Sequence, residues 1–565
     1  MTQVPPIDWQ RPAAEMFFAP GVDPGLSTLA PLPRMWRSVP RGRIAGASVS
    51  ADDATAHRTA DHIDMHTRLR AFRAGIVTTT VLVHVTQLRA QEHFLAVGDR
   101  FLLTGAAGTR LRNRYVWKAE PGRDMDAEVA RAFDRHRAAA KAPDLHDGDV
   151  SRLPFVVDAR NGTNFYHFVT ETLCQLCAVD ADWFRGDVHI HMKGPDISSF
   201  VMAWVEAIFP RLVGRVHLTR TDRDYGPALT VLNGRHWYCQ TTDEVIPSLD
   251  PLAPDSHVWR GRQPERASQG MLAMNSCDEM LIRLRETALD RIAGQDWSHL
   301  PRRFWVGRKS VRDRAMAGEA DLRADLARRG FETIYFEDFT PLEQVALMAN
   351  ADIMMSYHGA GFANMIFAEA DTHCIEIGTL QTALFRWQDF MPHALASGCR
   401  YTSFFADYNL DDPEEQVDER RGKALAAVAL TASGRARVLG FVDAVIGRVR
   451  VTSISRLSEL ARLLSRLEDH AALLRLIDGH RGAERREPSL HILKANALQG
   501  LGRPRDAFDA LVAAWEAGPP RAFLLERLIL AGRDAGADTA AAEAEHTQRF
   551  PEHGKRLARK LRRLG

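Results

Sequence analysis

The feature that most constrains the fold is a short apolar run followed by a turn rich in glycine. The run covers residues 352–356, and residues 357–364 read Tyr-His-Gly-Ala-Gly-Phe-Ala-Asn. Gly359 and Gly361 have no Cβ, so the turn can be tight and a ligand can approach the backbone closely. A strand, such a turn and a helix start together point backbone N–H groups at an anion. The layout predicts a phosphate-binding loop, although a turn that only joins a strand to a helix fits the same letters.

Segments of strand and helix character alternate around this loop. Strands are predicted at 304–307, 331–336, 352–356 and 373–377, and helices at 319–329 and 341–350. Thr340 is a candidate cap for the second helix, and Pro341 suits its first turn. Such alternation predicts parallel βαβ units in a Rossmann-like sheet, where ligands bind at the carboxyl ends of the strands. Arg308 and Arg314 follow one of these strands, so two strand ends offer groups suited to an anion.

The polar and glycine positions of this segment also form an ordered pattern. Its members are Arg308, Arg314, Glu319, Gly330, Phe331, Glu343, Gln344, Ala351, Asp352, His358, Gly359, Ala360, Gly361, Asn364, Phe367, Glu376 and Ile377. In this order and spacing, residues 304–378 resemble the signature half of glycosyltransferase family 61, of the bacterial, capsular-polysaccharide type. One position departs from the family pattern, because Gly318 stands where asparagine usually precedes the acidic residue.

The resemblance implies that this half binds the diphosphate and sugar of a nucleotide-sugar donor. The implied donor-binding residues are Arg308, Arg314, His358, Gly359, Ala360, Gly361, Asn364 and Glu376. Arg308, Arg314 and the N–H groups after the glycines would stabilise the charge that builds up on the leaving diphosphate. His358 and Asn364 would hydrogen-bond phosphate or sugar. Glu376 would accept hydrogen bonds from ribose hydroxyls, although an ordinary paired carboxylate fits that position equally well.

A histidine and a carboxylate stand one helical turn apart in an earlier segment. His167 and Glu171 are i and i+4 in a predicted helix at 165–178, so both project from one face. Read alone, the pair is typical of a capped helix with an internal hydrogen bond. With Asn164, however, it resembles a second part of the family pattern. An inverting transferase needs a base for the proton of the acceptor hydroxyl. Glu171 is the predicted base with His167 orienting it, and the reversed roles stay open.

The length allows several domains, since 565 residues with 45% hydrophobic side chains can build more than one core. The resemblance implies an α/β fold with two Rossmann-like domains in a GT-B arrangement, followed by an all-α repeat region. The predicted divisions are an irregular, partly β region at 1–150, an acceptor domain at 151–270, a donor domain at 271–423 and a helical region at 424–565.

The helical region carries part of a tetratricopeptide pattern. The matching positions are Ala495, Leu498, Gly502 and Ala507, with a break at Pro519. Repeats of this kind usually form a concave surface, which predicts a protein partner. A helical cap that only stabilises the neighbouring domain would explain the same residues.

Charge and apolar patterning exclude some classes of function. The net charge of +1 provides no field for nucleic acid. No segment resembles a signal peptide, and no apolar run approaches the roughly 20 residues of a spanning helix. These features predict a cytoplasmic protein, with peripheral contact at the inner face of a membrane left open. Asp-x-Asp pairs do occur, but none follows an evident apolar strand, so no required metal or other cofactor is predicted. The pairs are at 124–126, 147–149, 180–182 and 222–224.

These features together predict an inverting glycosyltransferase that moves a hexose or pentose onto a glycan hydroxyl. The resemblance alone implies a UDP-sugar donor and an acceptor in surface or capsular polysaccharide synthesis. Two other functions stay open. The first is a sugar-nucleotide epimerase, which shares the architecture but needs no acceptor. The second is a non-catalytic scaffold that acts through its helical repeats.

Overall fold

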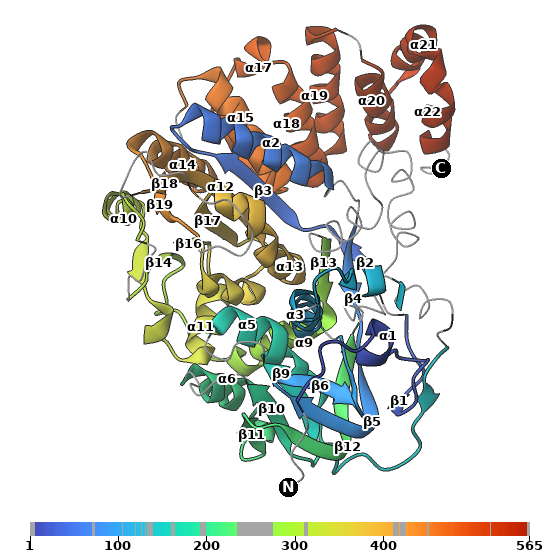
Figure 1. The fold of residues 1–565 in the computed structure, drawn as a ribbon. Helices are drawn as coiled ribbons and strands as arrows, with labels where there is room; N and C mark the ends of the chain where they lie inside the picture. The colour runs from blue at the N-terminus through green and yellow to red at the C-terminus, as the bar shows by residue number, and fades with distance from the viewer. Residues whose placement is uncertain are drawn as a thin grey trace.

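The fold is known from a computed structural model, which describes residues 6–561 with several gaps. The gaps are 35, 70–73, 104, 119, 126, 130, 133–138, 140, 160–163, 193–198, 234–274, 310–314, 411–416, 418–424, 449–450 and 520. Two large sheets, a small one and a C-terminal group of helices make up the described part (Figure 1). The prediction of a mixed α/β chain with a helical C-terminal region is therefore confirmed.

A seven-stranded sheet carries the glycine loop. The strand order is β15-β14-β16-β17-β18-β19, with β3 also paired to β18. Its strands are β3 (Arg43–Ser48), β14 (Arg303–Val306), β15 (Glu332–Ile334), β16 (Ile353–Tyr357), β17 (His373–Thr379), β18 (Arg400–Asn409) and β19 (Ala427–Ala429). Every described pairing is parallel except that of β19. All residues of β16 and β17 are buried, as expected where helices cover both faces of a parallel sheet.

The order of the strands reverses between β14 and β16. The chain passes from β14 to β15 on one side, and then places β16, β17 and β18 on the other side. In open α/β sheets, ligands bind at such a reversal, in the crevice beside the carboxyl ends of the strands. Here the two ends are the residues that follow Val306 and Tyr357.

Helices cover both faces of this sheet. Phe304 contributes to the hydrophobic core on one face, and its neighbour Trp305 contributes to the core on the other. The covering helices nearest to the glycine loop are α9 (Glu279–Ile292), α11 (Pro341–Ala349) and α13 (Trp387–Ser397). The cap predicted for α11 is present, since Thr340 and Glu343 form a reciprocal capping box. Neither α13 nor the preceding α12 (Leu380–Phe385) was predicted.

A nine-stranded sheet combines a parallel part with an antiparallel part. Its main order is β11-β10-β9-β12-β5-β1-β8, and β6 and β7 continue from β5. The strands are β1 (Leu26–Thr28), β5 (Thr80–Gln91), β6 (Phe94–Val97), β7 (Arg100–Phe101), β8 (Asp144–Leu145), β9 (Phe155–Ala159), β10 (Val188–Met192), β11 (Val216–Thr219) and β12 (Arg223–Asn233). β9, β10 and β11 pair in parallel, whereas β12 runs antiparallel to β5.

The first 150 residues contribute strands to every sheet. β1 and β5 to β8 belong to the nine-stranded sheet, and β3 lies beside β18 in the seven-stranded sheet. The third sheet has the order β13-β4-β2, with bounds Ser276–Asp278, Ala74–Thr78 and Trp36–Pro40. Helix α2 (Asp53–Leu69) packs on β3 and α12. The predicted domain boundaries stay predictions, but the N-terminal strands are interleaved with both large sheets.

The C-terminal helices follow β19, which lies inside the region predicted to be helical. They are α14 (Ala432–Val445), α15 (Ile454–Arg466), α16 (His470–Asp478), α17 (Ala483–Arg486), α18 (Ser489–Gly500), α19 (Pro504–Ala517), α20 (Ala522–Asp534), α21 (Ala540–Arg549) and α22 (Gly554–Leu561). One hydrophobic core runs from the seven-stranded sheet through α14 to α16 and reaches Leu490. A separate core joins α18 to α22. The assignment to tetratricopeptide repeats stays a prediction.

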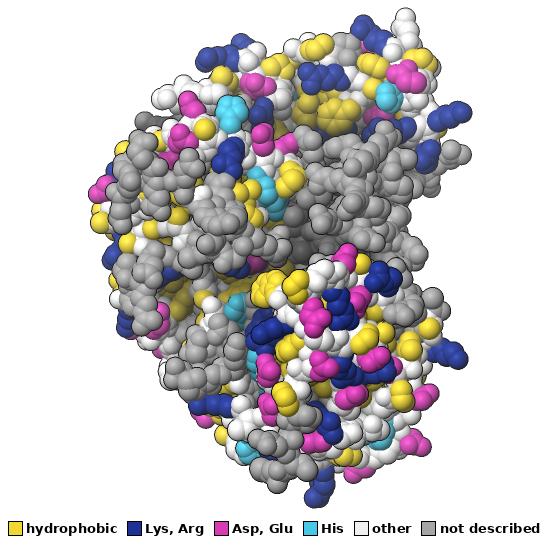
Figure 2. Space-filling model, viewed as in Figure 1, with side chains coloured by type: hydrophobic (Ala, Val, Ile, Leu, Met, Phe, Trp, Pro, Cys, Tyr) yellow, Lys and Arg dark blue, Asp and Glu magenta, His cyan; other side chains and the backbone are white. Residues whose placement is uncertain are grey.

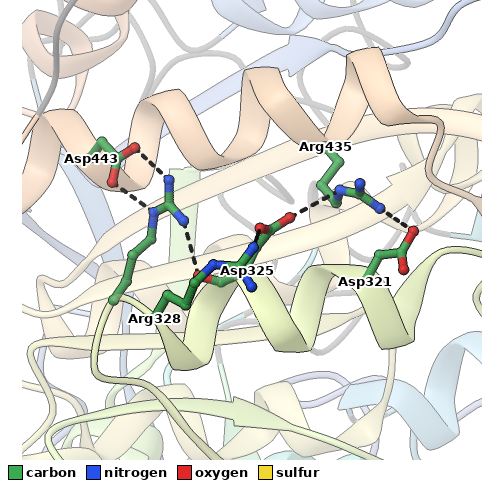
Figure 3. A network of polar contacts seen from close by, with 6 residues as sticks. Asp321, Asp325, Arg328, Arg435 and Asp443 are labelled. Carbon is green, nitrogen blue, oxygen red and sulfur yellow. Dashed lines mark hydrogen bonds and ion pairs between the residues drawn. The ribbon is translucent and has the colours of Figure 1, made fainter.

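Polar contacts also attach the first of these helices to the sheet. Helix α10 (Glu319–Ala327) lies against α14, where Arg435 pairs with Asp321 and Asp325 (Figure 3). In the interior, His373 of β17 lies 2.9 Å from Asp469, which caps α16. Helices α14 to α16 are therefore part of the structure that supports the sheet.

None of the described helices is both long enough and apolar enough to cross a membrane.

Candidate functional site

Arg308 lies directly against the glycine loop. It follows β14, and its Nη2 donates a hydrogen bond to the carbonyl oxygen of His358. Its guanidinium carbon lies 4.3 Å from the centroid of the Tyr357 ring. A Cβ at position 359 would come within 2.2 Å of Arg308 Nη2, so any other residue there would require the guanidinium to move. Arg308 and the loop thus form one unit at the point where the strand order reverses.

The loop continues into a short helix, as the sequence predicts. This helix, η7 (Ala360–Phe367), has 3₁₀ geometry and begins after Gly359. Gly361 is less restricted than Gly359, because a Cβ there would meet only the edge of the Phe336 ring, at 3.3 Å. Arg314, the second predicted cation, lies outside the described residues.

His358 is oriented by a buried carboxylate. Its Nδ1 lies 2.6 Å from Glu376 Oε1, and the Glu376 side chain is 0% exposed. The other carboxylate oxygen of Glu376 accepts hydrogen bonds from the hydroxyls of Tyr401 and Ser403. Three partners therefore hold Glu376 beneath His358, and the carboxylate is not open to ribose hydroxyls. Tyr401 and Ser403 were not foreseen as members of the site.

Asn364 is also buried, with 0% of its surface exposed. Its Nδ2 donates to Gln344 Oε1 at 3.0 Å, and Gln344 Nε2 donates to the carbonyls of Phe336 and Phe339. This chain of amide hydrogen bonds ties η7 to α11. The position indicates that Asn364 holds the loop in place, and its contact with phosphate or sugar stays a prediction.

His167 and Glu171 form a second pair, on the helical segment after β9. His167 Nδ1 lies 2.8 Å from Glu171 Oε1, and the two side chains are 21% and 17% exposed. Asn164 caps the segment by accepting a hydrogen bond from the His167 backbone N–H. Because Nδ1 contacts the carboxylate and no described residue hydrogen-bonds Nε2, Nε2 is the nitrogen left for a ligand.

The predicted helix at 165–178 changes its winding along its length. It begins as α5 (Phe165–His167), widens to the π-helix η1 (Phe168–Thr172) and tightens to the 3₁₀ helix η2 (Leu173–Ala178). Short π-helical turns are rare and occur often at functional sites. Glu171 lies in this π-helical turn, which makes the segment a good candidate for function.

Asp158 lies near Glu171, at the carboxyl end of β9. The Thr172 hydroxyl donates to the Asp158 carbonyl at 3.0 Å, which ties the strand end to the π-helical turn. Burial raises the pKa of Asp158 to about 7; the charge of Arg110 opposes this shift and that of Glu171 adds to it. Sequence reasoning missed Asp158, although an acidic residue at the end of an apolar strand was a visible signal.

Helix α13 contacts the segments that carry both histidines. The Tyr166 hydroxyl donates to the carbonyl of Asp389 at 2.9 Å, and Thr170 Oγ1 lies 2.9 Å from His393 Nε2. The Phe390 ring lies 5.2 Å from the ring of His358 and 5.5 Å from that of Tyr166. The two histidine–carboxylate pairs are therefore linked through one helix.

On the face seen in Figure 2, the side chains of Lys and Arg are interspersed with those of Asp and Glu. Among the described residues, no group of three or more His, Cys, Asp or Glu side chains is arranged to hold a metal ion. Independence from metal stays a prediction.

These features define an α/β protein with a glycine loop at a sheet reversal, an arginine held against that loop, and two oriented histidines whose segments both contact α13. Residues 165–375 match the family model described as Glycosyltransferase 61. This central region is therefore similar to the glycosyltransferase 61 family, and the match indicates glycosyltransferase activity. The matched residues include His167, Glu171 and Arg308, and they end one residue before Glu376. A comparison with curated proteins found no match.

Proposed function

We propose that this protein is an inverting glycosyltransferase that uses a nucleotide sugar, UDP-linked, as donor. The observation that carries the proposal is Arg308, held at the sheet reversal against the glycine loop and its oriented His358. The acceptor is a glycan hydroxyl in surface or capsular polysaccharide synthesis, and the transferred sugar is a hexose or pentose. The proposal extends to a GT-B arrangement, a cytoplasmic location and a protein partner on the C-terminal helices.

The donor diphosphate binds at the glycine loop. Arg308 supplies a fixed positive charge, and the first N–H groups of η7 supply hydrogen-bond donors. His358 Nε2 faces the same ligand, because Glu376 holds the opposite nitrogen of the ring. As the bond from the anomeric carbon to the diphosphate breaks, the bonding electrons leave with the phosphate oxygen. These groups stabilise that charge without rearranging, which lowers the barrier.

His167 is the general base. The acceptor oxygen attacks the anomeric carbon, and the proton of the hydroxyl passes to His167 Nε2. Glu171 fixes the ring through Nδ1 at 2.8 Å and stabilises the positive charge that develops on it. This assignment takes the second of the two alternatives that the sequence left open, in which Glu171 orients and His167 accepts the proton.

The proposal is tested by measuring the binding of UDP and UDP-sugars to the protein, with and without EDTA. A ligand at a hundred times its dissociation constant stabilises the folded protein by about 2.7 kcal/mol, which a thermal shift detects. We expect stabilisation that EDTA does not affect and that Arg308→Ala abolishes. Arg505→Ala is the matched control, because that side chain is 65% exposed in α19.

Three results would contradict parts of the proposal. Lack of stabilisation by any nucleotide would favour the scaffold function, and binding partners of residues 424–565 would then be sought. Nucleotide sugar that is isomerised without an acceptor would identify an epimerase. Binding that EDTA abolishes would show that the donor site needs a metal.

A further inference from the structure

Asp389 lies where the two histidine–carboxylate pairs approach each other. It belongs to the first turn of α13, outside the residues that match the family model, and its side chain is 29% exposed. The hydrogen bond from the Tyr166 hydroxyl to its carbonyl fixes it relative to the neighbouring His167. The next residue, Phe390, contacts the His358 ring. The backbone of Asp389 is thus held from both sides.

The carboxylate of Asp389 is within electrostatic reach of both histidines. Partial burial raises its pKa, and the charges of Arg386, His358 and His167 oppose the shift in that order, while Glu376 adds to it. His358 lies in the glycine loop that follows β16, and His167 lies on the helical segment after β9. The Asp389 carboxylate thus interacts with one imidazole from each of the two histidine–carboxylate pairs.

The side-chain oxygens of Asp389 have few partners. Its one ion pair is with Arg386, whose Nη1 lies 3.6 Å from Oδ2. No described N–H or O–H group donates a hydrogen bond to either oxygen, whereas Glu171 and Glu376 are each in hydrogen-bond contact with a histidine. The side chain is 29% exposed, so water or a ligand can reach it, and an ionised carboxylate can only accept hydrogen bonds. The donor for Asp389 must therefore come from water or a ligand.

We propose that Asp389 binds hydroxyl groups of the transferred sugar and thereby determines which sugar the enzyme accepts. This inference rests on the proposed function. A sugar attached to a diphosphate at Arg308 presents hydroxyl donors, and a carboxylate has two oxygens that match adjacent hydroxyls. A site built to hold a hydroxyl strongly rejects an analogue that lacks it, because its polar group is then left unpaired. Asp389 would hold the sugar between His358 on the donor side and His167 on the acceptor side.

Isothermal titration calorimetry of wild type and Asp389→Asn tests the proposal. The ligands are UDP, UDP-glucose, UDP-galactose, UDP-N-acetylglucosamine and UDP-xylose. We expect Asp389→Asn to bind UDP with unchanged affinity. It should bind the preferred UDP-sugar about 10- to 100-fold more weakly, as is usual when a hydrogen bond to a charged group is lost. Deoxy analogues of that sugar should weaken binding to wild type and cause no further loss in the variant.

Asp182→Asn is the matched control, since that side chain is 91% exposed. Asp389→Glu, which keeps the charge, separates loss of the carboxylate from loss of folding, and thermal unfolding without ligand is recorded for each variant. The Asp389 proposal is overturned if Asp389→Asn binds the UDP-sugar as wild type does, even if transfer stops, or if UDP and UDP-sugar weaken equally. Failure of wild type to bind any nucleotide would instead overturn the proposed function, and this inference with it.

Discussion

The two histidine–carboxylate pairs use the same contact in different surroundings. In both, Nδ1 of the histidine lies within 2.8 Å of a carboxylate oxygen. His167 and Glu171 are one turn apart on a single helical segment, and both side chains are partly exposed. His358 directly follows β16, Glu376 lies on the adjacent β17, and Glu376 is fully buried with two further hydrogen bonds. One pair is local and accessible, and the other is assembled by the sheet and enclosed.

This difference suits the two halves of a transfer reaction. A group that accepts a proton must change its charge during turnover. The partial exposure of His167 and Glu171 to solvent allows such a change. A group that holds a diphosphate needs a fixed position, because preorganised contacts cost nothing at the moment of reaction. The enclosed pair is fixed by Tyr401 and Ser403, whereas the accessible pair relies on the cap of its own helix.

Replacing each histidine with alanine should separate the two roles most strongly. His167→Ala should reduce transfer by about 10²- to 10⁴-fold while UDP binding is retained, because only the proton acceptor is lost. His358→Ala, in contrast, should weaken the binding of UDP itself. Release of UDP from the UDP-sugar in the presence of acceptor, together with titration of UDP, measures both effects.

Glu171→Gln refines this comparison. If His167 is the base, Glu171→Gln keeps part of the activity that His167→Ala loses, since the ring remains although its orientation is weakened. Equal losses in the two variants would instead identify Glu171 as the base. Full transfer by His167→Ala would exclude the accessible pair from proton transfer altogether.

Two glycines in one loop provide the next comparison. Gly359→Ala would place a Cβ 2.2 Å from Arg308 Nη2 and displace the guanidinium, whereas Gly361→Ala would meet a ring edge at 3.3 Å. We expect Gly359→Ala to weaken UDP binding about 10- to 100-fold, the usual cost of a lost charge-assisted hydrogen bond. Gly361→Ala, the control, should bind nearly as wild type does. Calorimetry measures the affinity of each variant for UDP. If Gly359→Ala binds UDP as wild type does, the diphosphate is not held by Arg308 in this position.

Local patterns predicted much of the sheet around the glycine loop. The strands, the capped helix α11 and the pairing of His167 with Glu171 each depend on residues close in sequence. Local sequence patterns are therefore enough to predict them. Glu376 beneath His358 depends on strand register, in which Ser356, Glu376 and Ser403 stand side by side on β16, β17 and β18. No short-range pattern encodes that register, and the ribose role predicted for Glu376 did not take it into account.

Helix α13 and strand β3 were missed for different physical reasons. Pro392 lies inside α13, and proline is among the strongest signals against a helix interior, so the tertiary packing of the helix overrides the local preference. Asp389 was therefore not considered. β3 is short and lies more than 350 residues from β18, its partner in the sheet. Only the folded structure reveals such a pairing.

The enclosed pair should matter more to stability than the accessible one. Glu376→Gln replaces a carboxylate that contacts His358, Tyr401 and Ser403 with an amide, which has one acceptor oxygen. We expect the free energy of unfolding to fall by about 1–3 kcal/mol, as for other buried polar groups that lose a partner. Glu171→Gln should cost less, since water reaches that side chain. Unfolding in urea measures the free energy of unfolding of both variants. A larger loss for Glu171→Gln than for Glu376→Gln would contradict the enclosed position assigned to Glu376.

A pH-dependent effect is expected from Asp158, the carboxylate next to the accessible pair. Burial raises the pKa of Asp158 from its ordinary 3.8 to about 7, so the folded protein holds this proton more tightly than the unfolded chain. Its contribution to stability is complete below the ordinary pKa and is lost as the pH rises towards 7. Asp158→Asn cannot titrate, so it should gain stability relative to wild type as the pH rises from about 4 to about 7.

Thermal unfolding across this pH range, with Asp187→Asn as an exposed control, tests the prediction. A gain that grows with pH would mean that Asp158 keeps its proton beside Glu171 in the folded protein. The Asp158 carboxyl would then add no negative charge beside the His167–Glu171 pair. A difference that does not change with pH would mean that Asp158 is ionised in the folded protein across this range, which would place its negative charge beside that pair.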